Sequence, residues 1–493
     1  MLGRSLRDLK NPVRVGDACA PCLPPEKLGD PEFLREHGLR YAYATGAMAN
    51  AIASAELVEA GSRAGILSFF GCAGLPLDEV EGAISRLQST LGSKPHGFNL
   101  IHSPNDPDLE NAVCDLYLRK GVRLVEASAF MGLTPAIVRY RLHGLRRGPH
   151  GELVVPNGIV AKVSRSEVAE KFLSPAPEAM LRELAAAGLV TPEEAELASG
   201  IPMAQDVTVE ADSGGHTDNR PLVSLLPAIL ALRDRVQAKR RFARPARVGA
   251  AGGIATPASA AAAYMMGAAY VLTGSVNQAC VESGSSDRVR KMLAEAGQAD
   301  VVMAPAADMF ELGVKVQVLK RGTMFAMRGA KLYEIYRSYD SIEALPASVR
   351  GPLEKDLFRE PLEDVWAKTR AFFLKRDPSQ IERAERDPKH RLALILRSYL
   401  GQASRWANAG APDRALDYQV WCGPAMGAFN EWVKGSFLEA PGNRAIAVVA
   451  RNILYGAAVL TRAHFLRCQG VFLDSEILRI QPQTAQELDR LLD

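Results

Sequence analysis

The sequence has few cysteines, no large excess of positive or negative charge, and no long apolar runs. Its seven cysteines are odd in number and scattered, without the spacing of a disulfide framework, which indicates a reducing compartment. The 59 basic and 56 acidic residues nearly cancel, and a net charge of +3 gives no general case for nucleic-acid binding. The first residues hold no apolar run long enough for a signal peptide, and later apolar stretches are broken by charges, glycine or proline. We therefore expect a globular, cytoplasmic protein with no membrane segment and no nucleic-acid partner.

Familiar catalytic signatures are missing as well. There is no Gly-x-Ser-x-Gly motif of a hydrolase and no His-Glu-x-x-His motif of a zinc protease. Cys19 and Cys22 form a C-x-x-C pair, but it lies in a proline-rich segment, follows no strand and has no second pair at zinc-ligand spacing. The sequence therefore predicts no metal site.

What the sequence does contain is an alternation of strand-length apolar runs with helical segments. Strand followed by helix predicts a parallel sheet of the α/β class, and eight such units favour a closed (β/α)8 TIM barrel over the alternative, a doubly wound sheet. The expected strands cover residues 41–45, 65–70, 97–101, 123–126, 159–163, 207–211, 247–250 and 270–273. The expected helices between them include residues 77–91, 108–120, 221–238 and 257–266.

The same pattern divides the chain into parts. Residues 1–39 are a proline-interrupted lead segment, and residues 40–285 carry the barrel. After the fifth strand, residues 164–206 predict a helical insertion, which would stand over the carboxyl ends of the strands as a lid or acyl-chain shelf. Residues 286–493 predict a large, wholly helical C-terminal region that binds substrate or a partner.

The sixth strand leads into the most polar loop of the barrel, in the stretch VTVEADSGGHTDNRP at residues 207–221. Gly214 and Gly215 lack Cβ atoms, so the backbone can take positive φ and let a flat or anionic ligand lie against it. His216 follows directly and can give or hold a proton near neutral pH. The alternative is a tight turn with a surface histidine.

The loops after the seventh and eighth strands are also rich in glycine. Gly252 and Gly253 precede Thr256-Pro257, a natural N-cap and first helical residue, which would leave bare N–H groups at a helix start. Gly274 and Ser275 follow the eighth strand. Because these two loops form the common phosphate pocket of barrel enzymes, they predict a phosphate-bearing cofactor or substrate, with close loop packing as the alternative.

Two polar side chains end apolar strands. A buried, unpaired Lys162 ammonium would be costly, so it should meet an anion or an electron-rich ring edge; a salt bridge to Glu126 or Asp212 is the simpler reading. Asn99 has the donor and acceptor to pair with the edge of a heterocycle, or it caps a turn.

Six runs of the sequence resemble the PfaD family, the trans-acting enoyl reductases of polyketide and polyunsaturated fatty acid synthases. That family is itself similar to the nitronate monooxygenase (2-nitropropane dioxygenase-like) FMN barrels. The match extends over roughly residues 40–471. The runs are GAMAN, ADSGGHTDNRP, GAAGGIATP, GAAYVLTGSVNQ, VQVLKRGTMF and DYQVWCGPAMGAFNEWVKGSFL.

The resemblance implies an enzyme that takes a hydride from NADPH through FMN and passes it to the β-carbon of an enoyl thioester held on acyl carrier protein. It nominates His216 as the catalytic proton donor or orienter. It implies a cofactor site in which Ala47, Met48 and Ala49 lie against the isoalloxazine and Asn99 and Lys162 hold its polar edge. The glycine loops complete that site. Gly214 is among the cofactor-binding residues, and the phosphate is bound by Gly215, Gly252, Gly253, Gly274 and Ser275.

Two other functions stay open at this point: a flavin oxidase of the nitronate monooxygenase type, and a non-catalytic docking component of a synthase. A homodimer is a possible assembly. An acidic carrier protein would need a basic landing patch on the enzyme. Candidate patches, with solvated helix faces as the alternative, are Arg139, Arg141, Arg146 and Arg147, and Lys239, Arg240, Arg241 and Arg244.

Overall fold

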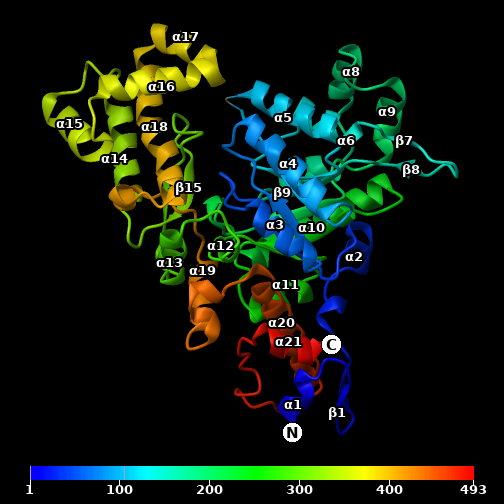
Figure 1. The fold of residues 1–493 in the computed structure, drawn as a ribbon. Coiled ribbons are helices and arrows are strands. Elements are labelled where there is room, and N and C mark those ends of the chain that lie inside the picture. The colour runs from blue at the N-terminus through cyan, green and yellow to red at the C-terminus, as the bar shows by residue number, and fades with distance from the viewer. Residues whose placement is uncertain (1, 105, 493) are drawn as a thin grey trace.

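The computed structural model describes residues 2–104 and 106–492, and its centre is a closed barrel of eight parallel strands (Figure 1). Strands that follow one another among these eight are neighbours in the barrel, and the last pairs with the first. They are β3 (Tyr43–Thr45), β4 (Leu67–Phe70), β5 (Gly97–Ile101), β6 (Leu124–Ser128), β9 (Gly158–Val163), β10 (Asp206–Glu210), β12 (Arg247–Ala251) and β13 (Val271–Thr273). The predicted TIM barrel is confirmed, and each strand lies where the sequence placed it.

Helices cover the outside of the barrel, and their starts are set by side-chain caps. Asp106 and Thr134 accept hydrogen bonds from backbone N–H groups three residues on, each just before a proline at the first helical position. These helices are α3 (Ala55–Arg63), α4 (Leu77–Leu91), α5 (Pro107–Lys120), α6 (Pro135–Leu142), α7 (Ser166–Leu173), α10 (Leu222–Arg240), α11 (Pro257–Met265) and the short α12 (Ser275–Gln278).

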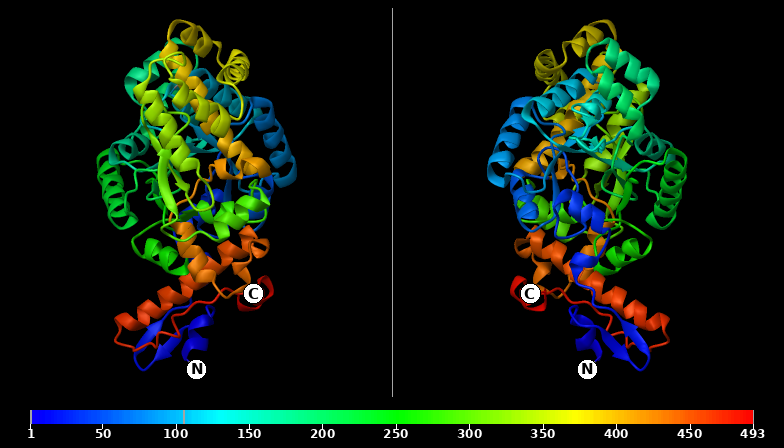
Figure 2. Two further views of the ribbon diagram at one scale, coloured as in Figure 1. Left: turned by 90° about the vertical axis from the view of Figure 1, so that its left-hand side faces the viewer. Right: turned by 90° about the vertical axis from the view of Figure 1, so that its right-hand side faces the viewer.

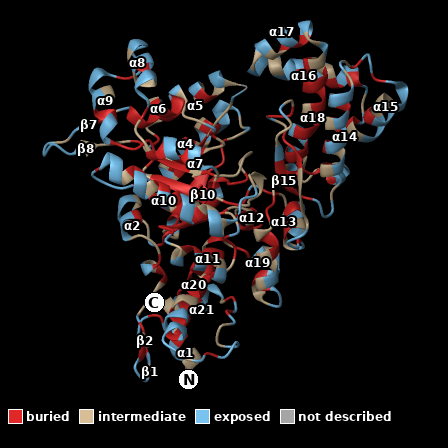
Figure 3. Cartoon of the chain, turned by 180° about the vertical axis from the view of Figure 1, so that it is seen from behind, coloured by how far each residue is buried: buried red, intermediate tan, exposed pale blue. Residues whose placement is uncertain are grey.

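The insertion after the fifth barrel strand is present as α7, α8 (Glu178–Ala186) and α9 (Pro192–Leu197), with a short turn η2 (Ala198–Gly200). It does not act as a lid. Helix α7 packs against α10 on the barrel wall, while α8 packs against α6, and α9 against β7 (Arg146–Arg147), which pairs with β8 (Leu153–Val154). Figure 3 shows α8 and α9 with exposed outer faces, away from the buried strand β10. All of residues 164–206 are described and none lines the cavity at the strand ends, so the expectation of a lid here is wrong.

The region after the barrel is mostly helical, but the prediction that it is wholly helical is wrong. Strands β14 (Val301–Pro305) and β15 (Lys315–Leu319) form a three-stranded antiparallel sheet with β11 (Gly215–His216). Both runs are β-branched, and the sequence pattern missed them because they fall outside the strand-helix alternation. This sheet joins the glycine loop of the barrel to the helical lobe.

The helical lobe stands to one side of the barrel mouth (Figures 1 and 2). Its own apolar core includes Phe325, Leu332, Leu396 and Tyr399. The helices are α13 (Asp287–Ala294), α14 (Phe325–Ser338), α15 (Ala347–Pro352), the π-helical η3 (Leu353–Phe358), α16 (Leu362–Arg376), α17 (Pro378–Arg386), α18 (Pro388–Ala409) and η4 (Pro412–Asp417).

The chain then returns to the barrel through α19 (Ala425–Val433), η5 (Phe437–Glu439), η6 (Pro441–Asn443) and α20 (Ile446–Cys468), ending in α21 (Ala485–Leu492). Helix α20 packs on α11, α3 and the lead segment, where α1 (Leu2–Arg7), β1 (Val13–Val15), β2 (Ala18–Ala20), η1 (Pro25–Lys27) and α2 (Pro31–His37) lie. Among the described residues it alone is long and apolar enough to cross a membrane, but 72% of its most apolar window is buried inside the protein. In this fold α20 is a core helix.

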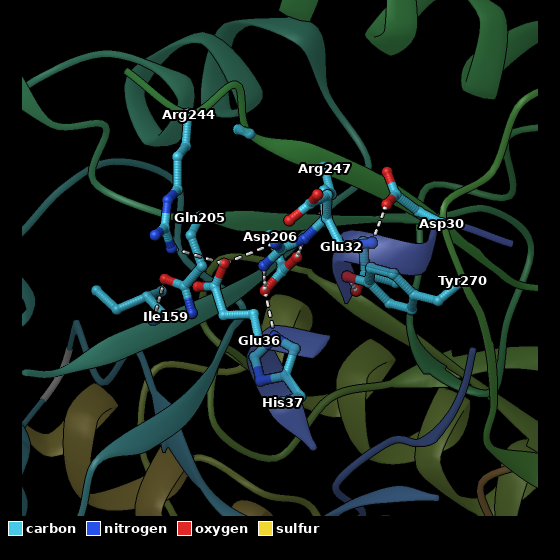
Figure 4. A network of polar contacts seen from close by, with 12 residues as sticks. Asp30, Glu32, Glu36, His37, Ile159, Gln205, Asp206, Arg244, Arg247 and Tyr270 are labelled. Carbon is cyan, nitrogen blue, oxygen red and sulfur yellow. Dashed lines mark hydrogen bonds and ion pairs between the residues drawn. The ribbon is translucent and has the colours of Figure 1, made fainter. Parts of the chain in front are cut away.

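A buried polar network closes the amino-terminal end of the barrel (Figure 4). Asp206, which is fully buried, accepts hydrogen bonds from Arg247 Nε at 2.6 Å and Nη2 at 3.0 Å, and its Oδ2 lies 2.7 Å from His37 Nε2. Arg247 also donates to Glu36 at 2.7 Å. The network fastens α2 to two barrel strands at the end opposite the predicted site.

Candidate active site

A cavity of about 860 Å³ opens where the barrel strands end and continues to the helical lobe. Carboxyl ends of barrel strands are where barrel enzymes build their active sites. Every residue nominated from the sequence lines this cavity: Ala47, Met48, Ala49, Asn99, Lys162, Gly214, Gly215, His216, Gly252, Gly253, Gly274 and Ser275. The structure brings them together, and the ligand role of each stays a prediction.

The loop after β3 forms one thin wall of the cavity. The N–H of Ala47 donates to Glu126 Oε2 at 2.9 Å, which ties the loop to the buried end of β6. A side chain at Gly71 would collide with the carbonyl of Met48, so only glycine lets the β4 end lie this close. Residues 47–49 therefore present backbone, two alanine methyl groups and the Met48 side chain to the cavity.

Lys162 is paired, and its partners are carboxylates of neighbouring strands. Its Nζ lies 3.3 Å from Glu210 Oε1 and 3.8 Å from Glu126 Oε2. Burial alone would lower the pKa of Lys162, but these two charges outweigh it and the net shift is upward. The sequence offered a salt bridge from Lys162 to Glu126 or to Asp212. The pairing with Glu126 is found, and the second carboxylate partner is Glu210 and not Asp212.

Glu126 is fully buried beside this lysine, and burial raises its pKa to about 7, despite the opposing charge of Lys162 and the N–H of Ala47. Its Oε1 has no hydrogen-bond partner in the described part of the chain. A carboxyl that titrates near neutral pH under the floor of a cavity is characteristic of functional sites.

Asn99 lies at the end of β5 and is almost fully buried. Its amide nitrogen donates to the carbonyl of Glu126 at 3.0 Å and to Ser128 Oγ at 2.9 Å. Those bonds fix the side chain across β6 and use both amide hydrogens. The amide oxygen is then the group that Asn99 can offer to a ligand.

His216 is held by the small sheet of the helical lobe. It pairs with Val316 of β15, and its Nε2 lies 3.2 Å from Asp308 Oδ2. Burial acts to lower the pKa of His216, but Asp308 outweighs burial and raises it. Gly214 packs so closely on the backbone of Cys422 that a Cβ would lie 2.8 Å from its nitrogen. The histidine is therefore placed on the cavity wall by β11 and paired with Asp308, and it is not a loose surface side chain.

The glycine loops after β12 and β13 offer backbone N–H groups to the cavity. Gly253 has φ +76°, and a Cβ added at Gly253 or Gly274 would meet no protein atom within 4 Å. No acceptor in the described residues takes the N–H of Gly252, Gly253 or Gly274. Unpaired N–H groups around an open cradle fit an anion such as phosphate.

One part of the phosphate prediction is wrong. The helix start at Thr256 is not bare, because Ser259 Oγ accepts the N–H groups of Ala255 and Thr256, both at 3.0 Å. Ser275 Oγ accepts the N–H of Gly423 at 3.0 Å, and in the described part of the chain its hydroxyl hydrogen stays free to donate to a ligand. Among the described residues, the N–H groups of Gly252, Gly253 and Gly274 and the Ser275 hydroxyl stay available as donors.

The sequence predicted a helical region that binds substrate or a partner, but it assigned none of the side chains of the helical lobe to the cavity. A signal for this wall was present in the DYQVWCG run, which carries Gln419 and Trp421 to the glycine loop. Phe372, Arg376 and Arg405 of α16 and α18 also line the cavity, with both arginines near the Phe372 ring, at 5.7 and 6.0 Å. These three side chains reach the cavity only after the lobe has packed against the barrel, so no local sequence pattern indicates that they line it.

The arginines of the first proposed basic patch differ in exposure. Arg141 is buried and donates to the carbonyls of Asn157 and Pro202, so it is a structural residue and the expectation that it docks a partner is wrong. Arg146 and Arg147 are exposed on β7. Docking of a carrier protein there stays a prediction.

The fold and the cavity define a (β/α)8 barrel with its site at the carboxyl ends of the strands, covered from one side by a helical lobe. Comparison with known proteins identifies that lobe first. Residues 339–418 match the family model of the inserted helical domain of acyl-carrier-protein S-malonyltransferase.

Over 449 residues the chain is 51% identical to one of the polyunsaturated fatty acid synthase proteins of Thraustochytrium sp., covering 89% of this chain and 30% of that protein. It is 47% identical over 436 residues to the polyketide biosynthesis protein PksE of Bacillus subtilis, covering 88% and 56%. The chain thus spans only about a third to about half the length of these two curated relatives.

A solved structure covers nearly the same length. The enoyl reductase domain of MlnA, from the macrolactin biosynthesis cluster of Bacillus amyloliquefaciens, is 38% identical with a TM-score of 0.84, covering 90% of this chain and 99% of that one. The chain belongs to the PfaD-like family of enoyl reductases. The resemblance seen in the sequence is confirmed.

Proposed function

We propose that this chain is an FMN-dependent enoyl reductase that uses NADPH to reduce the α,β-double bond of enoyl thioesters carried on acyl carrier protein. The reaction would serve polyketide or polyunsaturated fatty acid synthesis in the cytoplasm, with the chain acting in trans or as part of a larger synthase. The observation that carries the proposal is the meeting of all the nominated residues around one cavity at the barrel mouth.

The cavity fits a phosphorylated flavin in three respects. The unpaired N–H groups of Gly252, Gly253 and Gly274 suit its phosphate. The thin wall at residues 47–49 suits a flat ring system, and the Asn99 amide oxygen and Lys162 ammonium suit its polar edge. When bound, FMN would supply hydride transfer, for which the protein itself has no group.

The remaining chemistry falls to side chains of the chain. Hydride addition at Cβ of an enoyl thioester builds negative charge on the thioester oxygen, so a donor aimed at that oxygen lowers the barrier. His216, whose pKa is raised by Asp308, is the group assigned to this task. The double bond also needs one proton at Cα to complete the reduction.

The shape of the cavity supports an acyl substrate. Beyond the barrel mouth it runs between α5 and the helices of the lobe, where its walls are apolar at Leu109, Val113, Phe373 and Leu394. The lobe wall belongs to the segment that matches a domain of an acyl-carrier-protein enzyme. We infer that the acyl chain enters here while the carrier protein stays outside.

An anaerobic assay tests the function. The purified protein should be reduced by NADPH and reoxidised by a crotonyl thioester, faster when the thioester is bound to a carrier protein than when it is free. Reoxidation by oxygen or a nitronate but by no enoyl thioester would favour the flavin oxidase instead. A protein that NADPH does not reduce at all would contradict the proposal.

A further inference from the structure

A second imidazole lines the same cavity and has no task in the function proposed so far. Of the eight histidines in the chain, His102 and His216 are the two among the described residues that line it. His102 follows β5 directly, three residues after Asn99. Its ring is stacked on that of Phe130, with centroids 5.2 Å apart and planes 24° apart.

A buried carboxylate holds one side of this ring. His102 Nδ1 lies 3.0 Å from Oε2 of Glu110, a residue of α5 that is only 5% exposed. Glu110 also accepts the N–H of Ser103 at 3.1 Å and the hydroxyl of Thr134. Burial acts to raise the pKa of Glu110, but the bonds from His102, Thr134 and Ser103 outweigh it and the net shift is downward. Glu110 is therefore an ionised acceptor.

The orientation of the ring follows from this contact. An ionised carboxylate can only accept, so Nδ1 carries a proton toward Glu110. Nε2 has no protein partner among the described residues, and the ring faces the cavity. A carboxylate that fixes the tautomer of a histidine and leaves its other nitrogen to the substrate is a recurring arrangement for proton transfer.

A purely structural role for the His102–Glu110 pair does not explain why an imidazole on the cavity wall is the partner of Glu110. A link between α5 and α6 needs only Glu110 and Thr134, which also caps α6 by accepting the N–H of Ile137 at 3.4 Å. The described residues place no lysine or arginine within ion-pair distance of Glu110. Its counter-group is instead an imidazole on the cavity wall.

We propose that His102, oriented by Glu110, is the second proton-transfer residue of the cavity and delivers the proton to Cα of the enoyl thioester. The inference rests on the proposed function. The hydride supplied from NADPH forms the Cβ–H bond. The ring acts in its doubly protonated form, with one proton on Nδ1 toward Glu110 and the second on Nε2. The electron pair of the double bond then forms the Cα–H bond with the Nε2 proton, whose N–H bond breaks and leaves its pair on nitrogen, while Nδ1 keeps its proton. Water reprotonates the ring, and His216 serves the thioester oxygen.

Turnover in D2O tests this assignment. In the wild type, Cα should receive one deuterium in a single configuration. In His102→Ala the rate should fall by at least about 100-fold, the label should spread over both faces, and added imidazole should restore part of the rate. His150→Ala, at an exposed position, is the control that should match the wild type.

Glu110 is a positioning residue, and its variant needs a readout that folding alone does not move. In Glu110→Gln, kcat should fall with little change in KM. Nitrogen-15 spectra of the histidines should show His102 protonated at Nδ1 in the wild type and a mixture of tautomers in Glu110→Gln.

The outcomes separate the two claims. A wild type that reduces no enoyl thioester overturns the proposed function, and this inference with it. If the wild type is active and His102→Ala keeps both its rate and its single labelled configuration, the inference alone is overturned. A wild-type spectrum with the His102 proton on Nε2 in place of Nδ1 would overturn the role of Glu110 without any activity measurement.

Discussion

At the scale of single residues, two cationic side chains of the cavity have different roles: Lys162 is a fixed charge, and His216 is the proposed proton donor. Lys162 is clamped between Glu126 and Glu210, so its charge is a fixed feature of the site. Among the described residues His216 forms an ion pair with Asp308, which is about half exposed, and the imidazole lines the cavity. Removing the two side chains should therefore have different effects, on turnover for His216 and on FMN retention for Lys162.

Replacing His216 with alanine should leave FMN bound and lower the rate of crotonyl-thioester reduction by about two to three orders of magnitude, because an aimed donor is lost. FMN content is measured from absorbance, and the rate from NADPH oxidation without oxygen. Turnover equal to that of the wild type would remove His216 from the mechanism.

The partner of His216 predicts a pH dependence. Asp308 raises the pKa of His216 against the effect of burial, so the protonated form persists to higher pH and activity that needs it falls only as the pH rises through that raised value. In Asp308→Asn this fall should begin at a lower pH. Profiles of kcat against pH that coincide for the two proteins would contradict the pairing.

Removing the Lys162 ammonium should weaken retention of FMN. In Lys162→Ala the carboxylates Glu126 and Glu210 lose their shared counter-charge, and an electron-rich ring edge loses its cation. The FMN content after gel filtration measures the effect, with the exposed Lys434→Ala as control. Full FMN occupancy in Lys162→Ala would show that the assignment is wrong.

At the scale of elements, the loop after β12 allows a matched pair of glycine variants. Gly253 and Gly188 both have positive φ, +76° and +68°, and both have open space where a Cβ would be. Alanine at either should cost about 1–2 kcal/mol of backbone strain. Only Gly253→Ala places a methyl group in the cavity, so only this variant should also bind FMN more weakly.

Thermal unfolding and FMN titration of the two variants separate strain from binding. Equal losses of stability together with equal FMN affinities would mean that the phosphate does not lie at Gly253. The more crowded Gly252 is unsuitable for this comparison, because a Cβ there would lie 2.5 Å from the carbonyl carbon of Ala211.

The sequence predicted those elements whose signals are local. Strand-length apolar runs placed all eight barrel strands, and pairs of glycines marked the loops at the site. His102 was missed because its partner Glu110 lies eight residues on, in the next helix, and the pairing exists only after β5 and α5 have packed. Arg141 was misjudged because a charged helix residue gives no sign that carbonyls of Asn157 and Pro202 will surround it.

At the scale of the whole molecule, the carboxyl end of the barrel forms the candidate site and the amino end contributes to stability. The carboxyl end holds the cavity and the helical lobe, bridged by the bond from Asn50 to Ser404 at 2.9 Å. The amino end holds the buried network around Asp206. The sequence predicted that the C-terminal helical region binds substrate or a partner, but nothing local to residues 339–418 says which face of the barrel the lobe covers.

Breaking the network at the amino end should lower stability without changing the site. Asp206→Asn removes the buried carboxylate that pairs with Arg247 and leaves Glu36 as its one ion-pair partner among the described residues, which should lower the free energy of unfolding by about 3–5 kcal/mol. Activity of the still-folded protein should match that of the wild type. Glu36→Gln, at a partly exposed position, should cost less. A stable Asp206→Asn variant with altered turnover would contradict this division.

The same network predicts acid sensitivity. Burial acts to raise the pKa of Asp206, but His37 and Arg247 outweigh it and the net shift is downward. Its contribution to stability is therefore complete above the unfolded value of about 3.9 and is lost as the pH falls through the folded value. The drop in melting temperature on acidification should be smaller in Asp206→Asn than in the wild type.

The most direct test of the account is to identify what the purified wild-type protein holds. The account predicts a yellow protein that releases FMN on heat denaturation, at about one molecule per chain, as measured by absorption and by the mass of the released compound. A colourless protein that takes up no FMN when the cofactor is supplied would contradict it.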